Sequence, residues 1–228
     1  MTARAGQGPA TSRGPRNAAV PLPSARKGSA PRSGDDLRSA LTAALERQTP
    51  PSSDFDFDDR PMPPDATLRE AGVLAAFHET DGRLYLTKRA ATMRHHPGQV
   101  ALPGGKLDPG DADVVAAALR EAQEEIGLDS AQLEILGTLP THRTVTQFRI
   151  TPVIGIVRGD FEPIAEPGEV AEVFALPFSH ISDPGRYRLE GRMWRGEWRA
   201  YRVAPFGPYY LWGATARILH GLAERLRA

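Results

Sequence analysis

Cysteine is absent from the 228 residues of this chain. Disulfides, thiolate metal sites and cysteine nucleophiles are therefore excluded, and any bound metal must use oxygen or imidazole ligands. Long apolar runs are absent too. No stretch of the sequence approaches the roughly 20 residues of a membrane-spanning helix, and the chain start lacks the apolar segment of a secretory signal. We therefore expect a cytoplasmic protein with no membrane partner.

An excess of either charge is also missing, because 28 basic residues balance 28 acidic ones. No overall field favours nucleic acid or an anionic membrane, so charge recognition must be local. The length suits one substantial domain with a tail. The sequence leaves both a monomer and a homodimer open.

The first 34 residues lack acidic residues but carry six basic ones, among Pro, Gly, Ser and Ala that cannot bury a core. We expect residues 1–34 to be a disordered basic tail. A targeting peptide is the alternative, which the prolines and glycines oppose. Next, "DDLRSALTAALERQ" (35–48) spaces Leu37, Leu41 and Leu45 at four-residue steps, which predicts a short amphipathic helix. Proline-rich residues follow, so 35–68 should be helix and linker and 69–228 the main domain.

The main domain mixes strand and helix patterns. "EAGVLAAFHE" and "GRLYLTKR", joined by "TDG", predict a hairpin, and "QLEILGTLP", "QFRITPVIGIVRG" and "EVFALPF" predict three further strands. "RYRLEGRMWRGEWRAYRVAPF" alternates like a second hairpin, and "LWGATARILHGLAERLRA" predicts a final helix. The predicted strands and helices do not alternate strictly along the chain, as they would in a doubly wound sheet. We therefore expect an α/β fold, a sandwich around a mixed β-sheet.

Three carboxylates crowd into "ALREAQEEIGL" (118–128): Glu121, Glu124 and Glu125. On a helix these positions share one face, where each like-charge pair costs roughly 0.2–0.5 kcal/mol. They also lie near the helix C-terminus, where the dipole disfavours negative charge. The apolar positions define a neighbouring core face, so we expect the acids to border a cleft without entering the core. Those apolar positions are Val115, Ala118, Leu119, Ala122 and Ile126.

A divalent cation would offset this repulsion, because Mg²⁺ and Mn²⁺ prefer hard oxygen ligands. The alternative is an ordinary solvated acidic helix face. The preceding loop, "GGKLDPGD", favours the metal, since its glycines let backbone approach a ligand closely. Asp111 and Asp113 suit a helix start, and Gly127 suits a helix stop.

At this point a family resemblance emerges. "GGKLDPGDADVVAAALREAQEEIGL" resembles the Nudix box, and "REAQEEIGL" (120–128) fits each fixed position of its second half. The first half departs from the pattern, because Ala112 stands where the box has Glu, as if one residue were inserted. Asp111 is the nearest acid, and the resemblance implies that it holds Arg120 in place.

Two further stretches narrow the resemblance. "LTKRAATMRHHPGQVALPGG" (86–105) is similar to the signature of coenzyme A pyrophosphohydrolases, and "YYLWGATARIL" resembles the last helix of the same group. The resemblance covers most of residues 70–225. It implies a Nudix-type α/β/α sandwich and an enzyme that hydrolyses the diphosphate of coenzyme A or its derivatives to 3′,5′-ADP and 4′-phosphopantetheine, or its acyl form.

Site residues follow from matching these motifs. The implied metal ligands for Mg²⁺ or Mn²⁺ are Glu121, Glu124, Glu125 and the Gly105 carbonyl. The implied substrate-binding residues are Arg89, Arg94, Gly104, Gly105 and Lys106. Arg89 and Arg94 are the candidates for selecting the 3′-phosphate, because arginine donates paired hydrogen bonds to phosphate. Adjacent His95 and His96 favour phosphate contact or exposure over a metal site, because neighbouring histidines rarely both reach one ion.

The proton acceptor has two candidate places in the family. One is the box, through Glu121 or Glu124 beside Arg120, and the other is Glu169 in the loop "EPGEVAEVFALPF". We favour the box because its acids already lie beside the metal. Two alternatives to coenzyme A hydrolysis stay open: a Nudix hydrolase of ADP-ribose or a dinucleotide, and a Nudix-like nucleotide-binding module without catalysis. The intact "REAQEE" opposes the second.

Overall fold

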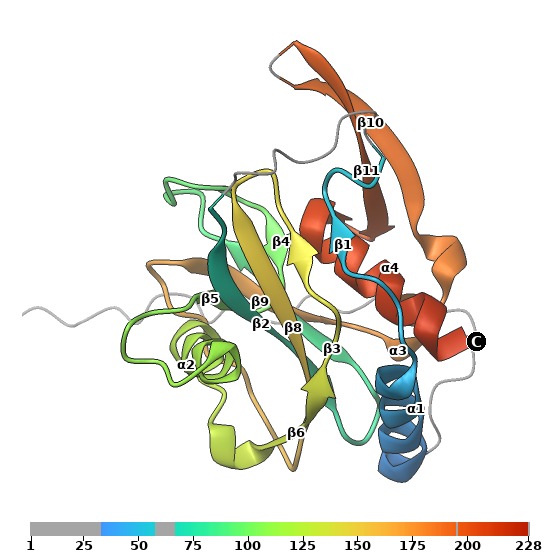
Figure 1. Cartoon of the computed structure of the whole chain (residues 1–228). Coiled ribbons are helices and arrows are strands. Elements are labelled where there is room, and N and C mark those ends of the chain that lie inside the picture. Colours follow the sequence, from blue (N-terminus) through green and yellow to red (C-terminus); the bar gives the residue numbers. More distant parts are fainter. Residues whose placement is uncertain (1–32, 58–66, 195, 228) are drawn as a thin grey trace, which may run out of the picture.

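The structure, a computed structural model, describes residues 33–57, 67–194 and 196–227. Within these residues the chain forms a nine-stranded mixed sheet and a separate three-stranded sheet (Figure 1). The helices are α1 (Gly34–Glu46), α2 (Val114–Ile126), α3 (Phe178–Ile181) and α4 (Gly213–Arg227). Short 3-10 turns cover Ser130–Gln132 and Pro184–Arg186. None of the described helices is long and apolar enough to cross a membrane.

The larger sheet has the order β1-β7-β8-β2-β3-β4, with β5 also beside β2, β6 beside β8 and β9 beside β3. Its strands are β1 (Ser52–Ser53), β2 (Arg69–His78), β3 (Leu84–Arg89), β4 (Val100–Ala101), β5 (Gly104–Lys106), β6 (Leu133–Thr138), β7 (His142–Arg143), β8 (Phe148–Val157) and β9 (Val170–Leu176). β2 runs parallel to β8 and antiparallel to β3. The mixed sheet and the first hairpin are therefore confirmed.

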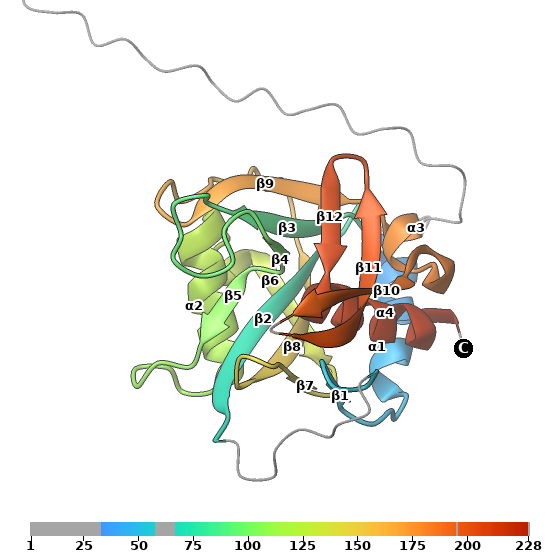
Figure 2. The same cartoon turned by 90° about the horizontal axis from the view of Figure 1, so that it is seen from above.

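β2 separates two hydrophobic cores, because successive side chains of a strand point to opposite faces. Leu74 and Ala76 pack with the apolar residues of α2. Ala75 and Phe77 pack on the other face, in the core that holds α1 and α4. Figure 2 shows α2 on one side of β2, and α1 and α4 on the other side. The α/β/α sandwich is thus confirmed.

The expected helix at 35–48 is confirmed as α1. Ser33 caps it by accepting a hydrogen bond from the backbone of Asp36. Leu37 and Leu41 are fully buried in the same core as α4, so this helix contributes directly to the hydrophobic core of the main domain. Apart from Ser33 and Gly34, the expected basic tail lies outside the described residues.

Part of the segment that was expected to be a linker is packed on the main domain. Residues 49–57 fold against the domain, and β1 pairs in parallel with β7. Asp54 accepts hydrogen bonds from the His142 ring and the backbone of Val145, and Asp56 pairs with Arg217 at 2.9 Å. These acids meet cationic and N–H partners distant in sequence, which no local pattern could predict. Residues 58–66 lie outside the described part.

α2 begins and ends as expected. The Asp113 side chain caps its start, and Gly127, at φ 71°, closes its end in the left-handed conformation that glycine tolerates. Its buried face is rotated from the expected one, since Glu125 is buried and Leu119 is only half buried. Gly72 explains the close contact of helix and sheet, because a Cβ there would lie 1.9 Å from the Val114 carbonyl oxygen. The expectation that all three acids stay outside the core is therefore wrong for Glu125.

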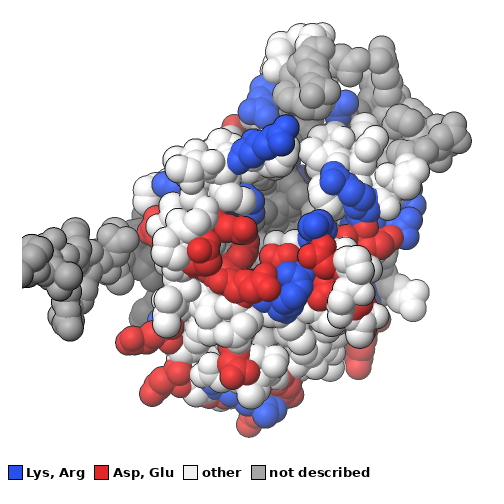
Figure 3. All heavy atoms as spheres, turned by 90° about the vertical axis from the view of Figure 1, so that its left-hand side faces the viewer, with Lys and Arg blue, Asp and Glu red and all other residues white. Residues whose placement is uncertain are grey.

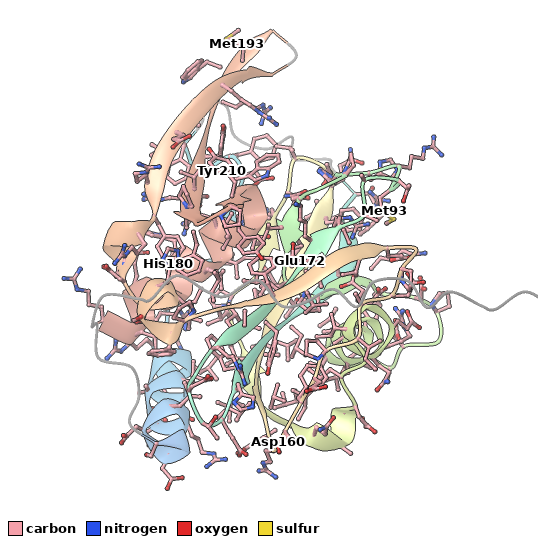
Figure 4. The ribbon with its side chains drawn as sticks, turned by 180° about the vertical axis from the view of Figure 1, so that it is seen from behind. Met93, Asp160, Glu172, His180, Met193 and Tyr210 are labelled. Atoms are coloured by element: carbon pink, nitrogen blue, oxygen red, sulfur yellow. The ribbon has the colours of Figure 1, made fainter. Side chains whose placement is uncertain are left out.

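The second sheet consists of β10 (Arg188–Trp194), β11 (Glu197–Phe206) and β12 (Tyr209–Trp212), all antiparallel. The expected C-terminal hairpin is thus confirmed and gains a third strand. β12 leads directly into α4, whose Leu219 and Leu222 are fully buried. The β10–β11 hairpin projects from the body of the molecule, with Met193 at its far end (Figure 4).

Candidate active site

β5 places backbone directly beside the acids of α2. It pairs with β2, so that Gly105 lies opposite Gly72. A Cβ on Gly105 would lie 2.3 Å from Glu121 Oε1, and one on Gly104, at φ 150°, would lie 2.4 Å from the Gly72 carbonyl oxygen. A side chain on Gly104 would meet the backbone of β2, whereas one on Gly105 would meet the end of the Glu121 side chain. The expected proximity of Gly105 and Glu121 is therefore confirmed.

Arg120 connects the acids of the site. Its Nε and Nη2 each donate to one carboxylate oxygen of Asp111 at 3.0 Å, which confirms the expected Asp111–Arg120 contact. Its Nη1 donates to Glu121 at 3.1 Å and to Glu124 at 3.0 Å. The Arg120 hydrogen bonds lower the pKa of Asp111. The sequence argument assigned the offset of this repulsion to a divalent cation, and the structure shows that Arg120 offsets part of it.

Glu125 is the least neutralised acid of the three. Its side chain is 5% exposed; the Gly104 N–H donates to Oε2 at 3.3 Å, and Arg89 Nη1 lies 3.8 Å from Oε1. Burial raises the pKa of Glu125 to about 7 and also raises that of Glu121. A cation bound here would stabilise the charged form that burial now disfavours.

The remaining expected site residues lie at different distances from this centre. Glu169 is exposed, and its carbonyl accepts a hydrogen bond at 2.8 Å from the N–H of Ala90, the residue that follows β3. Burial is the main cause of the raised pKa of Glu121 and of Glu125, and the charge of Glu169 raises both further. Lys106 is exposed and pairs with Asp108 at 2.9 Å.

The structure therefore brings together Arg89, Gly104, Gly105, Arg120, Glu121, Glu124 and Glu125. Arg94 instead lies in the exposed loop between β3 and β4, as do His95 and His96. Figure 3 shows acidic side chains gathered across the face that carries α2, with basic side chains among and above them.

These residues fit a hard divalent cation by the chemistry of their donors. All are oxygens, and one is a buried carboxylate whose charged form lacks full compensation. Among the described residues, no three His, Cys, Asp or Glu side chains already converge as ligands. Glu121 and Glu124 turn toward Arg120, and Glu125 toward Gly104. A bound cation would therefore have to draw Glu121 and Glu124 from Arg120.

A cavity of about 330 Å³ adjoins this centre at Gly104. It lies between the two sheets, with an apolar floor that includes Val73, Leu102 and Ile150. Its opposite wall carries residues that the sequence motifs did not identify: Arg192, Arg199, Tyr201 and Arg202. The arginine-rich run "RLEGRMWRGEWRAYR" was visible in the sequence, but which side chains face the cavity depends on the strand register.

Comparisons with known proteins identify the family of this chain. The NUDIX domain profile matches residues 68–197. A Nudix hydrolase NudL from Cronobacter sakazakii is 42% identical over 159 residues, covering 69% of this chain and 83% of that protein. A NudL protein from Enterobacter sp. strain 638 is 44% identical over 160 residues, with the same coverage of both chains.

A solved structure of a C. elegans Ap4A hydrolase matches 47% of this chain and 79% of its own, at 19% identity and a TM-score of 0.41. That likeness is too loose to support any argument about the site. The match to the domain profile and the relatives above 40% identity carry the assignment. This chain belongs to the Nudix hydrolase family.

Proposed function

We propose that this Nudix hydrolase cleaves the diphosphate bond of coenzyme A or its derivatives, releasing 3′,5′-ADP and 4′-phosphopantetheine or its acyl form. One observation carries the proposal. The two stretches that resemble coenzyme A pyrophosphohydrolases, 86–105 and 209–219, are far apart in sequence but line the same cavity. The Thr215 hydroxyl joins them by donating to the Val100 carbonyl oxygen at 3.2 Å. The cavity adjoins Glu125 through Gly104.

For the metal, we assign Glu121 and Glu125 as principal ligands, one helical turn apart. Glu124 and the Gly105 carbonyl would complete the protein's share of the ligands, and waters and phosphate oxygens would supply the others. Bound Mg²⁺ or Mn²⁺ would neutralise the charge that develops on the diphosphate during hydrolysis. Glu124 has the most exposed side chain of the three acids, at 58%.

For the proton transfer, we assign the acceptor to the box, to Glu121 or Glu124, over Glu169. A carboxylate takes a proton from the water that attacks phosphorus. Glu121 is mostly enclosed and Glu124 lies beside it, whereas Glu169 is on the exposed loop before β9. Arg120 acts as a positioning residue for both box acids, and Asp111 in turn holds Arg120.

For the diphosphate, we assign Arg89, Lys106 and the backbone of Gly104 and Gly105. Arg89 lies 3.8 Å from Glu125, so its guanidinium is placed for diphosphate oxygens at the metal end. The 3′-phosphate, which Arg89 was expected to help select, would then need cations elsewhere. Arg94 remains a candidate, from an exposed loop.

A substrate panel at fixed Mg²⁺ tests the proposal. Coenzyme A should be hydrolysed with higher kcat/KM than ADP-ribose or a dinucleotide, and chromatography should detect 3′,5′-ADP and 4′-phosphopantetheine in equal amounts. Solvent ¹⁸O would identify the phosphorus that is attacked. A preference for ADP-ribose or a dinucleotide would contradict the proposal and favour the broader nucleoside-diphosphate assignment.

Two variants test the assigned residues. Glu125→Gln should be folded but nearly inactive with Mg²⁺, since it removes a ligand that no other side chain replaces. Glu169→Gln should keep near-native turnover if the box supplies the proton acceptor. A large loss of kcat in Glu169→Gln would move that role to the loop.

A further inference from the structure

The segment 49–57 forms part of the wall of the cavity beside the active site. Ser53, Asp54 and Phe57 line that cavity, together with the apolar floor that the larger sheet provides. The segment precedes residues 68–197, which the NUDIX domain profile matches. It is nevertheless fixed to the domain, because β1 pairs in parallel with β7. Figure 2 shows β1 beside β7 at one edge of the larger sheet.

The Asp54 carboxylate joins this segment to β7 and to the loop that follows it. Its Oδ1 accepts a hydrogen bond from Nε2 of His142 at 3.1 Å, and its Oδ2 accepts one from the Val145 N–H at 3.0 Å. His142 is fully buried, and its Nδ1 lies 2.9 Å from the Ser52 hydroxyl. The segment 49–57 therefore holds the His142 ring through both of its nitrogens, and each oxygen of Asp54 has a defined partner.

The loop between β7 and β8 is a three-residue hairpin turn. The Thr144 N–H donates to the Phe148 carbonyl oxygen at 2.9 Å, and the Gln147 N–H donates to the Thr144 carbonyl oxygen at 3.1 Å. Gln147 has φ 65°, the left-handed conformation that ends a hairpin loop of this length. Val145 is therefore the second residue of the turn. Thr144, Val145 and Thr146 all line the cavity.

Asp54 gives this turn its connection to the neighbouring cavity wall. The turn has hydrogen bonds of its own, since the Thr144 and Thr146 hydroxyls lie 2.9 Å apart and the Phe148 N–H donates to the Thr144 hydroxyl at 3.0 Å. Those bonds preserve the shape of the turn. The bond from Val145 to Asp54 instead joins it to the segment 49–57, so it fixes two parts of the cavity wall relative to each other.

The cavity is connected to the active site but its wall is separate from the reacting groups. Gly104 lines the cavity and donates its N–H to Glu125 at 3.3 Å, so a diphosphate placed at Glu125 would leave another part of the substrate in the cavity. The other acids of α2 are held by Arg120, and no hydrogen bond among the described residues joins them to Asp54. A change at Asp54 should therefore alter substrate binding and leave the reacting groups in place.

We propose that Asp54 is a positioning residue for substrate binding, which acts through Val145 and His142 on the cavity wall. The segment 49–57 is then part of the substrate-binding site, although it precedes the residues that the domain profile matches. This inference rests on the proposed function only in that the cavity receives the part of the substrate beyond the diphosphate.

Steady-state kinetics on coenzyme A at fixed Mg²⁺ test the inference. Asp54→Ala should raise KM by about tenfold or more, the contribution of one hydrogen bond to a charged group. Its kcat should stay within about twofold of the wild type, because binding shared by substrate and transition state affects KM alone. Asp54→Asn keeps one acceptor oxygen and should show a smaller rise. The matched control is Asp183→Ala, since Asp183 also accepts a backbone N–H, from Gly185 at 3.0 Å, but does not line the cavity, and its KM should equal that of the wild type.

Val145→Pro removes the same hydrogen bond from its other side. Proline is favoured at the second position of such a turn, so the turn should be retained without the N–H that Asp54 accepts. This variant should also raise KM, and it should add little to Asp54→Ala because both remove one contact.

Thermal unfolding identifies the variants that are folded at the assay temperature, where a purely structural role of Asp54 would leave KM unchanged. An unchanged KM in folded Asp54→Ala or in folded Val145→Pro would overturn the inference. A fall in kcat with KM unchanged would overturn it as well.

The same measurements separate this inference from the proposed function. If the wild type hydrolyses ADP-ribose or a dinucleotide but not coenzyme A, the KM of that substrate is compared instead. A rise in Asp54→Ala would then support the inference while the proposed function fails. If coenzyme A is hydrolysed with equal KM by the wild type and the variants, the role of Asp54 is wrong and the proposed function stands.

Discussion

Replacing Glu125 by Gln should inactivate the enzyme and yet stabilise its metal-free form at alkaline pH. Glu125 is 4% exposed, with a single N–H donor and an arginine 3.8 Å away. Burial raises its pKa from 4.5 to about 7. A neutral amide keeps nearly the same shape and can still accept from Gly104, but it lacks the charge that burial disfavours.

The size of the effect follows from the pKa difference between the folded and unfolded states. The difference is about 2.5 units, and one unit corresponds to about 1.4 kcal/mol, so the maximum is about 3 kcal/mol. Because the folded pKa is the higher one, the folded protein binds this proton more tightly than the unfolded chain. The contribution is therefore fully present below pH 4.5 and is lost as pH rises to about 7.

The assay is urea unfolding in a metal chelator at pH 5 and pH 8, for the wild type and Glu125→Gln. Between these values the free energy of unfolding of the wild type should fall by about 2–3 kcal/mol relative to that of the variant. Glu124→Gln is the matched control, since its side chain is 58% exposed and its pair with Arg120 should contribute less than about 1 kcal/mol.

Adding Mg²⁺ at pH 8 should reverse the order of the two proteins. A ligand that binds only the folded state stabilises it, and the variant lacks the carboxylate that we assign to this cation. The reasoning would be refuted if Glu125→Gln were less stable than the wild type in chelator at pH 8. It would also be refuted if Mg²⁺ stabilised both proteins equally.

Three other predictions concern the site and the core. Gly105→Ala should lower kcat more than tenfold while thermal unfolding shows a folded protein, because its Cβ would lie 2.3 Å from Glu121 and displace that carboxylate; near-native kcat would contradict the assigned contact. Leu41→Ala should cost about 2–5 kcal/mol in urea unfolding, since Leu41 is fully buried beneath α4; a loss below 1 kcal/mol would mean that α1 is not part of the core. Hydrogen bonds from Arg38 and, to a smaller extent, Arg158 lower the pKa of Glu134 to about 2. Glu134 should therefore contribute about 1 kcal/mol of stability above pH 4.5. That stability should disappear as pH falls toward 2, and Glu134→Gln should lack this pH dependence; an equal dependence in both proteins would argue against the ion pairs.

Local sequence patterns were enough to predict individual helices, turns and hairpins. The cap at Asp113, the stop at Gly127 and the first hairpin follow from residues within a few positions of each other, and the structure has all three. The Asp111–Arg120 contact could also be predicted, because both residues belong to one short motif with a one-residue insertion. Such features depend on backbone geometry within one or two turns, which sequence spacing determines.

Contacts between segments that are distant in sequence could not be predicted from local patterns. The burial of Glu125 depends on how closely α2 approaches β2, and that distance is set by Gly72, more than 50 residues earlier in the chain. The ordered segment 49–57 depends on partners in β7 and α4, so its composition alone suggested a linker.

The sequence was enough to exclude thiolate ligands for any metal, to place three acids on one helix face and to place glycines before them. These conclusions need only side-chain chemistry and helix periodicity. The tertiary structure was needed to show that Arg120 shares the charge of Glu121 and Glu124, and that Glu125 is buried. It alone placed Arg192 opposite Arg199 on the wall of a cavity, because strand register and the contact between two sheets arise from the folding of the whole chain.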